Sequence, residues 1–311
     1  MENTLLETVW RILALGYHQS FSSLAYSIQH PGPTNSILVL IGLSLFFWAW
    51  EIVKPWRVKQ GAFRKDFWLD AFYMFFNLFL FPVLGFAAFS NLVFYFWGWL
   101  LGTLGFAGTV VINLGGWPGW SQLLMLFLVR DFVHWNVHRT LHRFPLLWAF
   151  HKVHHSVEQL GFAAHLRYHW MENILYRIPE FLALSLFGFG VKDFFIVYTL
   201  ALFIGHWNHS NIYLPLGPLK YILNNPQMHI WHHAWELPAK YGVNYGISLS
   251  VWDYIFGSAY IPADGRDIKL GFEGLSEFPA GLSGQLIYPL EISARKTVDD
   301  KSVDDKSGEG R

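Results

Sequence analysis

The chain has no cysteine and few charged residues. Without cysteine it cannot form disulfides, thiolate metal sites or cysteine-dependent redox centres. Only 14% of its 311 residues are charged, whereas a soluble globular domain carries roughly 25%. The net charge is zero and the basic residues are scattered, which argues against a nucleic-acid-binding surface. Together with a hydrophobic fraction of 53%, the low charge indicates a membrane protein.

One long segment lacks charge entirely. From Ala71 to Val129 there is no Asp, Glu, Lys or Arg. A single helix of that length would measure about 90 Å, but the hydrocarbon core of a bilayer is only about 30 Å thick. We therefore expect this segment to fold back on itself within the lipid.

The apolar runs and the basic residues together predict a topology. A first span, about 37–50, is followed by basic residues at 54–65, which the positive-inside rule places in the cytoplasm. Residues 71–88 would leave the cytoplasm and residues 120–132 would return. We expect 92–112 to be re-entrant or an extracytoplasmic hairpin, so that His134 emerges on the cytoplasmic side.

A second apolar stretch, 174–206, predicts a hairpin that turns near Gly188-Phe189-Gly190. Each arm has about 15 apolar residues, fewer than the roughly 20 of a perpendicular span, so we expect tilt or shallow insertion. The fold class is thus all-α: an integral membrane protein with about four membrane-spanning or membrane-inserted helices and a histidine-rich helical cap on the cytoplasmic face.

Thirteen of the fifteen histidines lie between His134 and His233. They form five groups with spacings of one, three or four residues: His134, His138 and His142; His151, His154 and His155; His165 and His169; His206 and His209; and His229, His232 and His233. On a helix, residues three or four apart share one face, so the imidazoles of a group can converge. Because one metal ion takes about six donors at most, ten or more convergent histidines imply two metal ions.

Carboxylates are scarce in this region, which narrows the type of metal site. Between His134 and His233 only Glu158, Glu172, Glu180 and Asp193 occur, and none begins a Glu-x-x-His pair. A carboxylate-rich di-iron bundle requires two such pairs. The His-Glu-x-x-His motif of zinc proteases is also absent.

The histidine motifs and the segments between them resemble the fatty acid hydroxylase/sterol desaturase superfamily. The matching segments are HRTLH (138–142), HKVHHS (151–156), LRYH (166–169) with Glu172, HSN (209–211), HIWHH (229–233), NYG (244–246) and WDYIFG (252–257). They follow the family's order over about residues 131–262. Two positions depart from the family pattern: Trp170 stands where proline is frequent, and His134 stands where the family has an aromatic residue.

The resemblance implies a di-iron centre with histidine ligands and no catalytic residue beyond the metal centre. The family's eight-histidine pattern falls on His138, His142, His151, His154, His155, His229, His232 and His233. His169 and His209 match two further family positions that would complete the metal site. Candidates to orient these ligands are Asp131, His134, His165, His206 and Asn244. Zinc is a substitute for iron, because imidazole discriminates poorly between these metals.

The resemblance also implies oxidation of a lipid C–H bond by O₂, as hydroxylation or desaturation. Such a bond has no acidic proton, so a cofactor must supply the oxidising power. The chain has no flavin or nicotinamide motif. We therefore expect an external electron donor, such as a ferredoxin or a cytochrome b5-like protein. The lipid could be a sterol, a fatty acyl chain or a related lipid.

These interpretations divide the chain into five regions. Residues 1–35 are an N-terminal amphipathic segment, since they lack the basic start and cleavage site of a signal peptide. Residues 36–133 form the transmembrane region and 134–262 the hydroxylase-like catalytic domain. Residues 263–292 are a C-terminal extension, and 293–311, with the repeat VDDKSVDDKS, form a disordered tail.

Two other classes of protein stay open. A bis-histidine haem electron carrier would also place histidines on membrane helices, but it needs isolated facing histidines rather than HxxHH groups. A divalent metal transporter would line a pore with histidines and acidic partners near the bilayer midplane. A Soret band would favour the first, and metal uptake by proteoliposomes the second.

Overall fold

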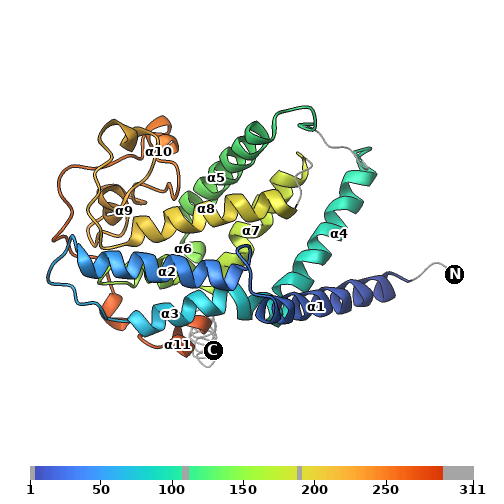
Figure 1. Ribbon diagram of the computed structural model, residues 1–311, viewed down its shortest axis with the longest axis horizontal. Helices are drawn as coiled ribbons and strands as arrows, with labels where there is room; N and C mark the ends of the chain where they lie inside the picture. Colours follow the sequence, from blue (N-terminus) through green and yellow to red (C-terminus); the bar gives the residue numbers. More distant parts are fainter. Residues whose placement is uncertain (1–3, 107–111, 188–190, 290–311) are drawn as a thin grey trace, which may run out of the picture.

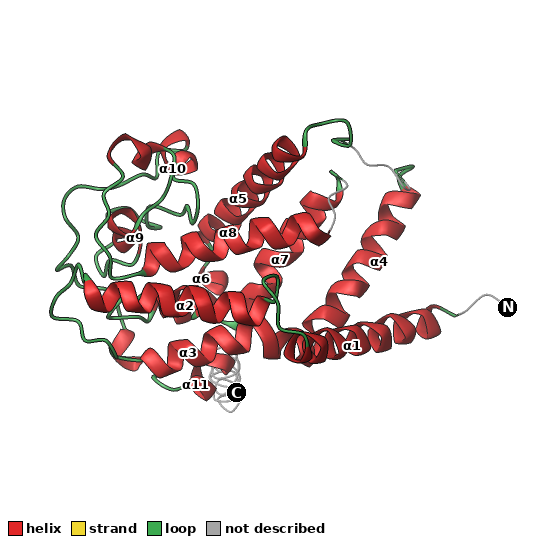
Figure 2. Ribbon diagram, viewed as in Figure 1, coloured by secondary structure: helices red, strands yellow, loops and turns green. Residues whose placement is uncertain are grey.

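The computed structural model describes residues 4–106, 112–187 and 191–289. Within these ranges the chain is helical, and β-structure is limited to three isolated bridges (Figure 2). The longer helices are α1 (Leu5–Gln29), α2 (Ser36–Val53), α4 (Ala87–Thr103), α5 (Gly119–Arg143), α7 (Trp170–Ser185) and α8 (Val191–His209). The shorter ones are α3 (Phe67–Phe75), η1 (Phe76–Leu80), η2 (Pro82–Phe86), α6 (Pro145–His155), η3 (Phe162–Leu166), η4 (Gly217–Tyr221), α9 (Pro226–His232), α10 (Val251–Ile255), η5 (Leu275–Glu277) and α11 (Leu282–Ile287). The all-α prediction is confirmed.

Two helical stretches among the described residues are long and apolar enough to cross a membrane: Ser36–Val53 and Phe67–Phe86. The first begins at Asn35, whose side chain accepts hydrogen bonds from the N–H groups of Ile37 and Leu38 and so satisfies two otherwise unpaired donors. The second is continuous through α3, η1 and η2. It changes direction at Gly85, whose φ of 150° is a backbone conformation that glycine adopts without steric cost. Both correspond to predicted spans, and the expected total of about four stays a prediction.

The other predicted membrane segments are helical where they are described. Residues 120–132 lie within α5, and the arms of the 174–206 hairpin are α7 and α8. Residues 92–103 continue α4 as a helix, whereas 107–111 lie outside the described residues, as do the predicted turn at 188–190 and the predicted disordered tail at 293–311.

Helices α5, α7 and α8 lie beside one another in the middle of the molecule (Figure 1). Away from the histidines they are joined by an apolar cluster of Leu126, Leu184 and Val197, one residue from each helix. These side chains are at most 3% exposed, and their burial stabilises each helix by roughly 1.5–3 kcal/mol per side chain. The opposite ends of α5 and α8 carry His138, His142 and His209.

The basic segment between α2 and α3 packs against the histidine-bearing part of the chain. Arg57 donates from its side chain to the carbonyl of Leu160 and from its backbone N–H to the Asn211 side chain (2.7 Å). Arg64 pairs with Asp70, and Arg167 pairs with Asp66 and Asp70. Because Arg64, Asp70 and Arg167 are buried, these pairs hold the start of α3 firmly against the segment that follows α6.

Candidate metal centre

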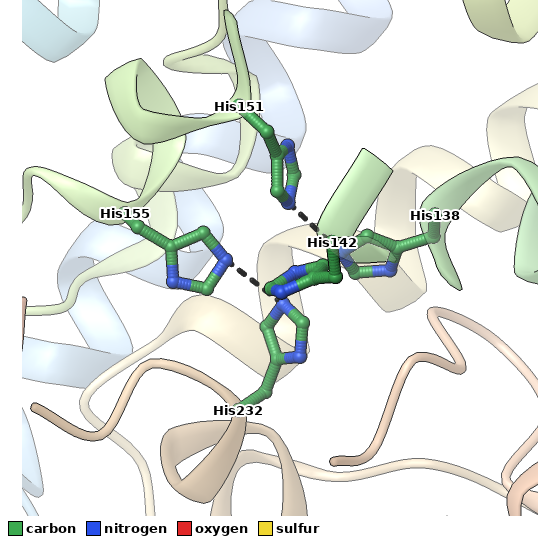
Figure 3. Close-up of side chains that lie close together, drawn as sticks. All are labelled: His138, His142, His151, His155 and His232. Carbon is green, nitrogen blue, oxygen red and sulfur yellow. Dashed lines mark hydrogen bonds between the residues drawn. The ribbon is translucent and has the colours of Figure 1, made fainter. Parts of the chain in front are cut away.

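Nine of the predicted ligands converge in two buried groups. The first, called here the five-histidine cluster, contains His138, His142, His151, His155 and His232 (Figure 3). The second, the four-histidine cluster, contains His154, His209, His229 and His233. Each histidine contributes one ring nitrogen, and within a cluster all of these nitrogens lie within 4.8 Å of one another.

Helix geometry explains how each cluster assembles. His138 and His142 are four residues apart on α5, so both face the same way. On α6, His151 and His155 turn to the five-histidine cluster, while His154 turns to the four-histidine cluster. The α9 segment divides in the same manner, with His232 in one cluster and His229 and His233 in the other. Each HxxHH motif therefore contributes to both clusters.

The nitrogen-to-nitrogen distances match those of donors around one ion. In the five-histidine cluster His138 Nε2 lies 3.1 Å from His151 Nε2, and His155 Nε2 lies 3.1 Å from His232 Nε2. In the four-histidine cluster the Nε2 atom of His209 lies 3.2 Å from that of His154 and 3.0 Å from that of His229. A metal–imidazole bond is about 2.1 Å long, so two donors at a right angle around one ion lie about 3 Å apart.

Backbone carbonyls determine which nitrogen of several imidazoles faces the cluster. A carbonyl oxygen only accepts hydrogen bonds. His138 Nδ1 donates to Tyr245 O (2.7 Å), and His232 Nδ1 donates to Val243 O (2.8 Å). In the four-histidine cluster, His154 Nδ1 donates to Arg167 O (3.1 Å) and His209 Nδ1 to Gly205 O (2.8 Å). In the neutral imidazole the Nε2 atom then carries a lone pair.

These lone pairs face one another without a proton between them. His154 Nε2 and His209 Nε2 are both acceptors in this tautomer, so their 3.2 Å approach is not a hydrogen bond but a repulsive contact unless a cation lies between them. Protonation does not supply that cation, because burial lowers the pKa of His154 to about 4. Burial and the neighbouring imidazoles also hold the pKa values of His142, His155 and His233 well below the usual range.

An unsatisfied nitrogen supports the same conclusion. His142 Nε2 is buried and has no hydrogen-bond partner. A buried polar atom without a partner costs about 1–3 kcal/mol, and coordination to a metal ion would remove that cost for a nitrogen that faces the ion. The donor set is entirely imidazole, which suits iron, zinc, copper or nickel. The residues present therefore fit a metal centre.

The two clusters adjoin each other. The rings of His155, from the five-histidine cluster, and His233, from the four-histidine cluster, are stacked with centroids 4.5 Å apart. This pair takes its members from α6 and from the end of α9. Two ions held in the two clusters would be close neighbours.

His169 is the predicted ligand that the structure does not bring into either cluster. The spacing of His165 and His169 suggested one helical face, but His165 lies in η3, Arg167 is extended, and His169 is the N-cap of α7. His169 Nδ1 accepts from the Met171 N–H (3.1 Å), and Nε2 donates to Leu286 O (2.9 Å). Both nitrogens are engaged, so its side chain caps α7.

The three extra histidines lie beside the clusters. His165 Nδ1 and His206 Nδ1 are 2.9 Å apart, and the His165 ring lies 5.2 Å from the His209 ring. His134 stacks on Tyr176, with ring centroids 4.1 Å apart, and its Nδ1 bonds to Glu180 Oε1 (2.8 Å). None of these three histidines belongs to either cluster.

Asp131 and Asn244 act on backbone rather than on a ligand side chain. Asp131 accepts hydrogen bonds from the N–H groups of Ser248 and Leu249 and from Trp252 Nε1. Asn244, at a φ of 55°, donates to Met228 O and Tyr260 O. Both fix the loop at 243–250, which supplies the carbonyls that hold His232 and His138.

Glu172 contacts a histidine of the five-histidine cluster, although it is not among the predicted site residues. Its Oε2 lies 2.7 Å from His151 Nδ1, and its Oε1 accepts from the His169 N–H (3.1 Å). Burial raises the pKa of Glu172 to about 8. Glu172 stands three residues after His169, which is the position of the Glu in a capping box, so the sequence pattern could have predicted its contact with the His169 N–H. The contact with His151 depends on the packing of α6 and α7.

A cavity of about 90 Å³ opens beside both clusters between α5, α7, α8 and η3. Its lining includes His138, His151, His154 and His209 from the clusters, and a second set made of Arg130, Arg177, Glu180 and Tyr198. No composition or spacing rule points to this second set, because its members come from three separate helices.

Comparison with known proteins gives one family. Residues 123–258 match the fatty acid hydroxylase family. The chain is 30% identical over 182 residues to the ornithine lipid hydroxylase OlsE of Rhizobium tropici, covering 58% of this chain and 54% of that protein. It is 31% identical over 146 residues to the alkylglycerol monooxygenase of Xenopus tropicalis, covering 47% and 31%.

A third relative is the methylsterol monooxygenase 1-1 of Arabidopsis thaliana, 29% identical over 144 residues, covering 44% of this chain and 46% of that protein. The chain thus spans about half, or less, of the length of these relatives. No solved structure matches it significantly.

Proposed function

We propose, from the premise that residues 123–258 belong to the fatty acid hydroxylase family, that this protein is a membrane-bound oxygenase that uses O₂ to oxidise a C–H bond of a lipid. The observation that carries the proposal is the pair of adjoining all-histidine clusters, in which buried lone pairs face one another. The three relatives described above are a hydroxylase and two monooxygenases by name.

The nine histidines of the two clusters would hold two iron ions. Iron bound there would supply the oxidising power that an aliphatic C–H bond requires and that acid and base side chains lack. The protein residues orient and shield the site. The carbonyls of Tyr245 and Val243 fix the tautomers of His138 and His232, and all nine rings are at most 7% exposed, which keeps bulk water away. His169 would cap α7 rather than bind metal.

An external electron donor would complete the reaction, because reduction of O₂ takes four electrons and oxidation of the substrate provides two. A ferredoxin or a cytochrome b5-like protein fits this role. We propose that the site lies on the cytoplasmic face of a multi-pass membrane protein. In support, the basic segment at 54–65 packs against residues 160 and 211, next to the histidines.

Candidate substrates come from the names of the relatives. Ornithine lipids are the first to test, since a relative that matches over 182 residues is named an ornithine lipid hydroxylase. Alkylglycerols and methylsterols follow. Hydroxylation is the expected outcome, and desaturation is distinguished from it by product mass.

The test compares the wild type with His154→Ala and, as a control, His18→Ala, whose ring lies on α1 outside the clusters. Each protein is expressed aerobically, metal is counted per chain, and extracted lipids are analysed by mass spectrometry. We expect about two metals per wild-type and control chain, a mass gain of one oxygen in a lipid, and loss of both in His154→Ala.

Identical lipid profiles in all three strains, with less than one metal per wild-type chain, would contradict the proposal. A Soret band in the purified protein would instead favour a haem electron carrier, and metal uptake by proteoliposomes would favour a transporter.

A further inference from the structure

The cavity beside the clusters contains charged groups that the metal centre does not use. Arg130, Arg177 and Glu180 line it, on helices that are otherwise largely apolar. Ionisable side chains in such helices are costly and mark functional pathways or binding sites. Their arrangement therefore calls for a ligand-based explanation.

The charged side chains that line the cavity do not all form ion pairs with one another. Glu180 Oε1 accepts from His134 Nδ1 (2.8 Å) and lies 3.4 Å from Arg130 Nη2. Arg177 instead donates from Nε to Asn173 Oδ1 (3.3 Å) and from Nη2 to the Tyr198 hydroxyl (3.2 Å). Among the described residues, no carboxylate forms an ion pair with Arg177.

Glu172 does not supply the missing negative charge. It is the other carboxyl group of the cavity, but its two oxygens bond to His151 Nδ1 and to the backbone N–H of His169. One guanidinium group thus lines the cavity with only neutral hydrogen-bond partners, since Glu180 is bonded to His134 and pairs with Arg130. A guanidinium group is the side chain best suited to bind a carboxylate or a phosphate through two parallel hydrogen bonds.

The position of Arg177 relates this charge to the histidines. Arg177 follows Glu172 by five residues on α7, an axial distance of about 7.5 Å. A volume of about 90 Å³ is too small for a whole lipid, because pockets for drug-sized ligands measure roughly 300–1,000 Å³. Only one part of a lipid can enter.

We propose that this cavity binds the anionic headgroup of the lipid substrate, with Arg177 pairing to its carboxylate or phosphate. This inference rests on the proposed lipid oxygenase function and specifies its substrate class. Oxidation then takes place close to the headgroup rather than far along an acyl chain. An uncharged sterol or alkyl chain in the cavity would leave the guanidinium group without a counter-charge, which is costly in a low-dielectric site.

The test uses three lipids with identical acyl chains: a phosphatidic acid, an N-acyl amino acid lipid with a free carboxylate, and an uncharged diacylglycerol. Native mass spectrometry measures binding of each to the full-length, metal-depleted protein, so this readout does not depend on activity. Oxidation of each lipid by the metal-loaded protein is measured in parallel, with fragmentation to locate the new oxygen.

Four proteins are compared: the wild type, Arg177→Gln, Arg177→Lys and the control Arg266→Gln. Arg266 is a half-exposed arginine that pairs with Asp264 and does not line the cavity. We expect the wild type and the control to bind at least one anionic lipid about tenfold more tightly than diacylglycerol, the order expected for a charge-assisted contact. Arg177→Gln should abolish this preference, and Arg177→Lys should keep part of it. The preferred anionic lipid then identifies the headgroup as carboxylate or phosphate.

Equal binding of diacylglycerol and both anionic lipids by the wild type would overturn the inference. So would an unchanged preference in a folded Arg177→Gln protein. If that variant does not fold, Tyr198→Phe replaces it. Removal of the hydroxyl that accepts from Arg177 should then weaken anionic binding severalfold, and no change counts against the inference. A preference that depends on Arg177 without oxidation of any lipid would support the headgroup site and contradict the oxygenase function.

Discussion

At the scale of single residues, metal binding depends on which imidazole nitrogen carries the proton. Carbonyl oxygens fix this choice for His138, His154, His209 and His232. His151 differs from these four, because its Nδ1 faces the Glu172 carboxyl group. Partners that fix the tautomer of a ligand typically change metal affinity 10–100-fold when they are replaced. Glu172 is therefore the side chain whose replacement most directly tests the site.

We expect Glu172→Gln to lower the metal affinity of the five-histidine cluster about 10–100-fold. A metal ion bound at His151 Nε2 would leave the proton on Nδ1, where an ionised Glu172 would accept it. The amide would instead present an N–H group to Nδ1 and so place the proton on the nitrogen that faces the cluster. Chelator competition measures the affinity. The control is Glu158→Gln, which removes an exposed carboxylate that pairs with Lys65. Unchanged affinity in a folded Glu172→Gln protein would mean that His151 is oriented by other contacts.

At the scale of elements, the loop at 243–250 holds the clusters in place although it contains no histidine. Asp253 accepts from the backbone N–H groups of Tyr245 (2.9 Å) and Gly246 (2.8 Å) and from Trp135 Nε1 (3.0 Å). These bonds join the loop to α5 and aim the Tyr245 carbonyl at His138. Asp253 therefore fixes the fold of this loop.

The prediction at this scale is that Gly246→Ala destabilises the protein. A Cβ atom there would collide with the Leu249 carbonyl oxygen and lie 2.9 Å from Asp253 Oδ2, and the first contact is with backbone that cannot move freely. Overpacking of this kind costs roughly 1–3 kcal/mol and should lower the melting temperature and the metal content.

Gly98→Ala is the matched control, since a Cβ atom at Gly98 on α4 meets nothing within 4 Å. Alanine favours a helix over glycine by about 1 kcal/mol, so the melting temperature should stay the same or rise. Equal stability of the two variants would show that the loop can shift without effect on the site.

At the scale of the whole molecule, the two clusters join segments far apart in the sequence. Their ligands come from α5, α6, α8 and α9 and from His233 directly after α9. Metal ions bound to all of these segments would favour the folded state over the unfolded chain. The stabilisation amounts to about 4 kcal/mol when the free metal exceeds its dissociation constant a thousandfold.

Metal removal should therefore lower the melting temperature of the detergent-solubilised protein, and added Fe²⁺ or Zn²⁺ should restore it. Differential scanning fluorimetry before and after treatment with a chelator measures the shift. His154→Ala, which removes one ligand of the four-histidine cluster, should show a smaller shift than the wild type. An equal melting temperature with and without metal would contradict a metal centre in these clusters.

The metal-free protein should also lose stability as the pH falls from 6.5 toward 4. Burial lowers the pKa of His154 to about 4, and the pKa values of the other cluster histidines are also lowered. The unfolded chain then binds more protons than the folded one in this range, so acid favours unfolding, by about 1.4 kcal/mol per pH unit for each such histidine.

Buried carboxyl groups with raised pKa values, among them Glu172 and Asp253, act in the opposite direction, but nine imidazoles outnumber them. Thermal melts at pH 7.5, 6.5 and 5.5 test the sign. A melting temperature that rises on acidification would show that the imidazoles already carry protons in the folded state.

Much of the fold and site could be predicted because the decisive signals are local. The spacing of His138 and His142 requires only a helix, and the HxxHH motifs at 151–155 and 229–233 identify imidazole as the donor. The low proportion of charged residues indicated a membrane protein, and the absence of cysteine excluded thiolate ligands. Residues that act through distant backbone, such as Asp131 and Asn244, were predicted near the site, but their partners were not.

The sequence by itself determined the helical fold, the apolar segments and the type of metal ligand, because these follow from periodicity and side-chain chemistry within a few residues. Only the tertiary structure decided how nine histidines divide into two clusters, and that His169 caps a helix instead. It alone also brought Arg130, Arg177 and Glu180 into one cavity. These results depend on the packing of α5, α6, α7, α8 and α9, whose contacts join residues up to a hundred positions apart.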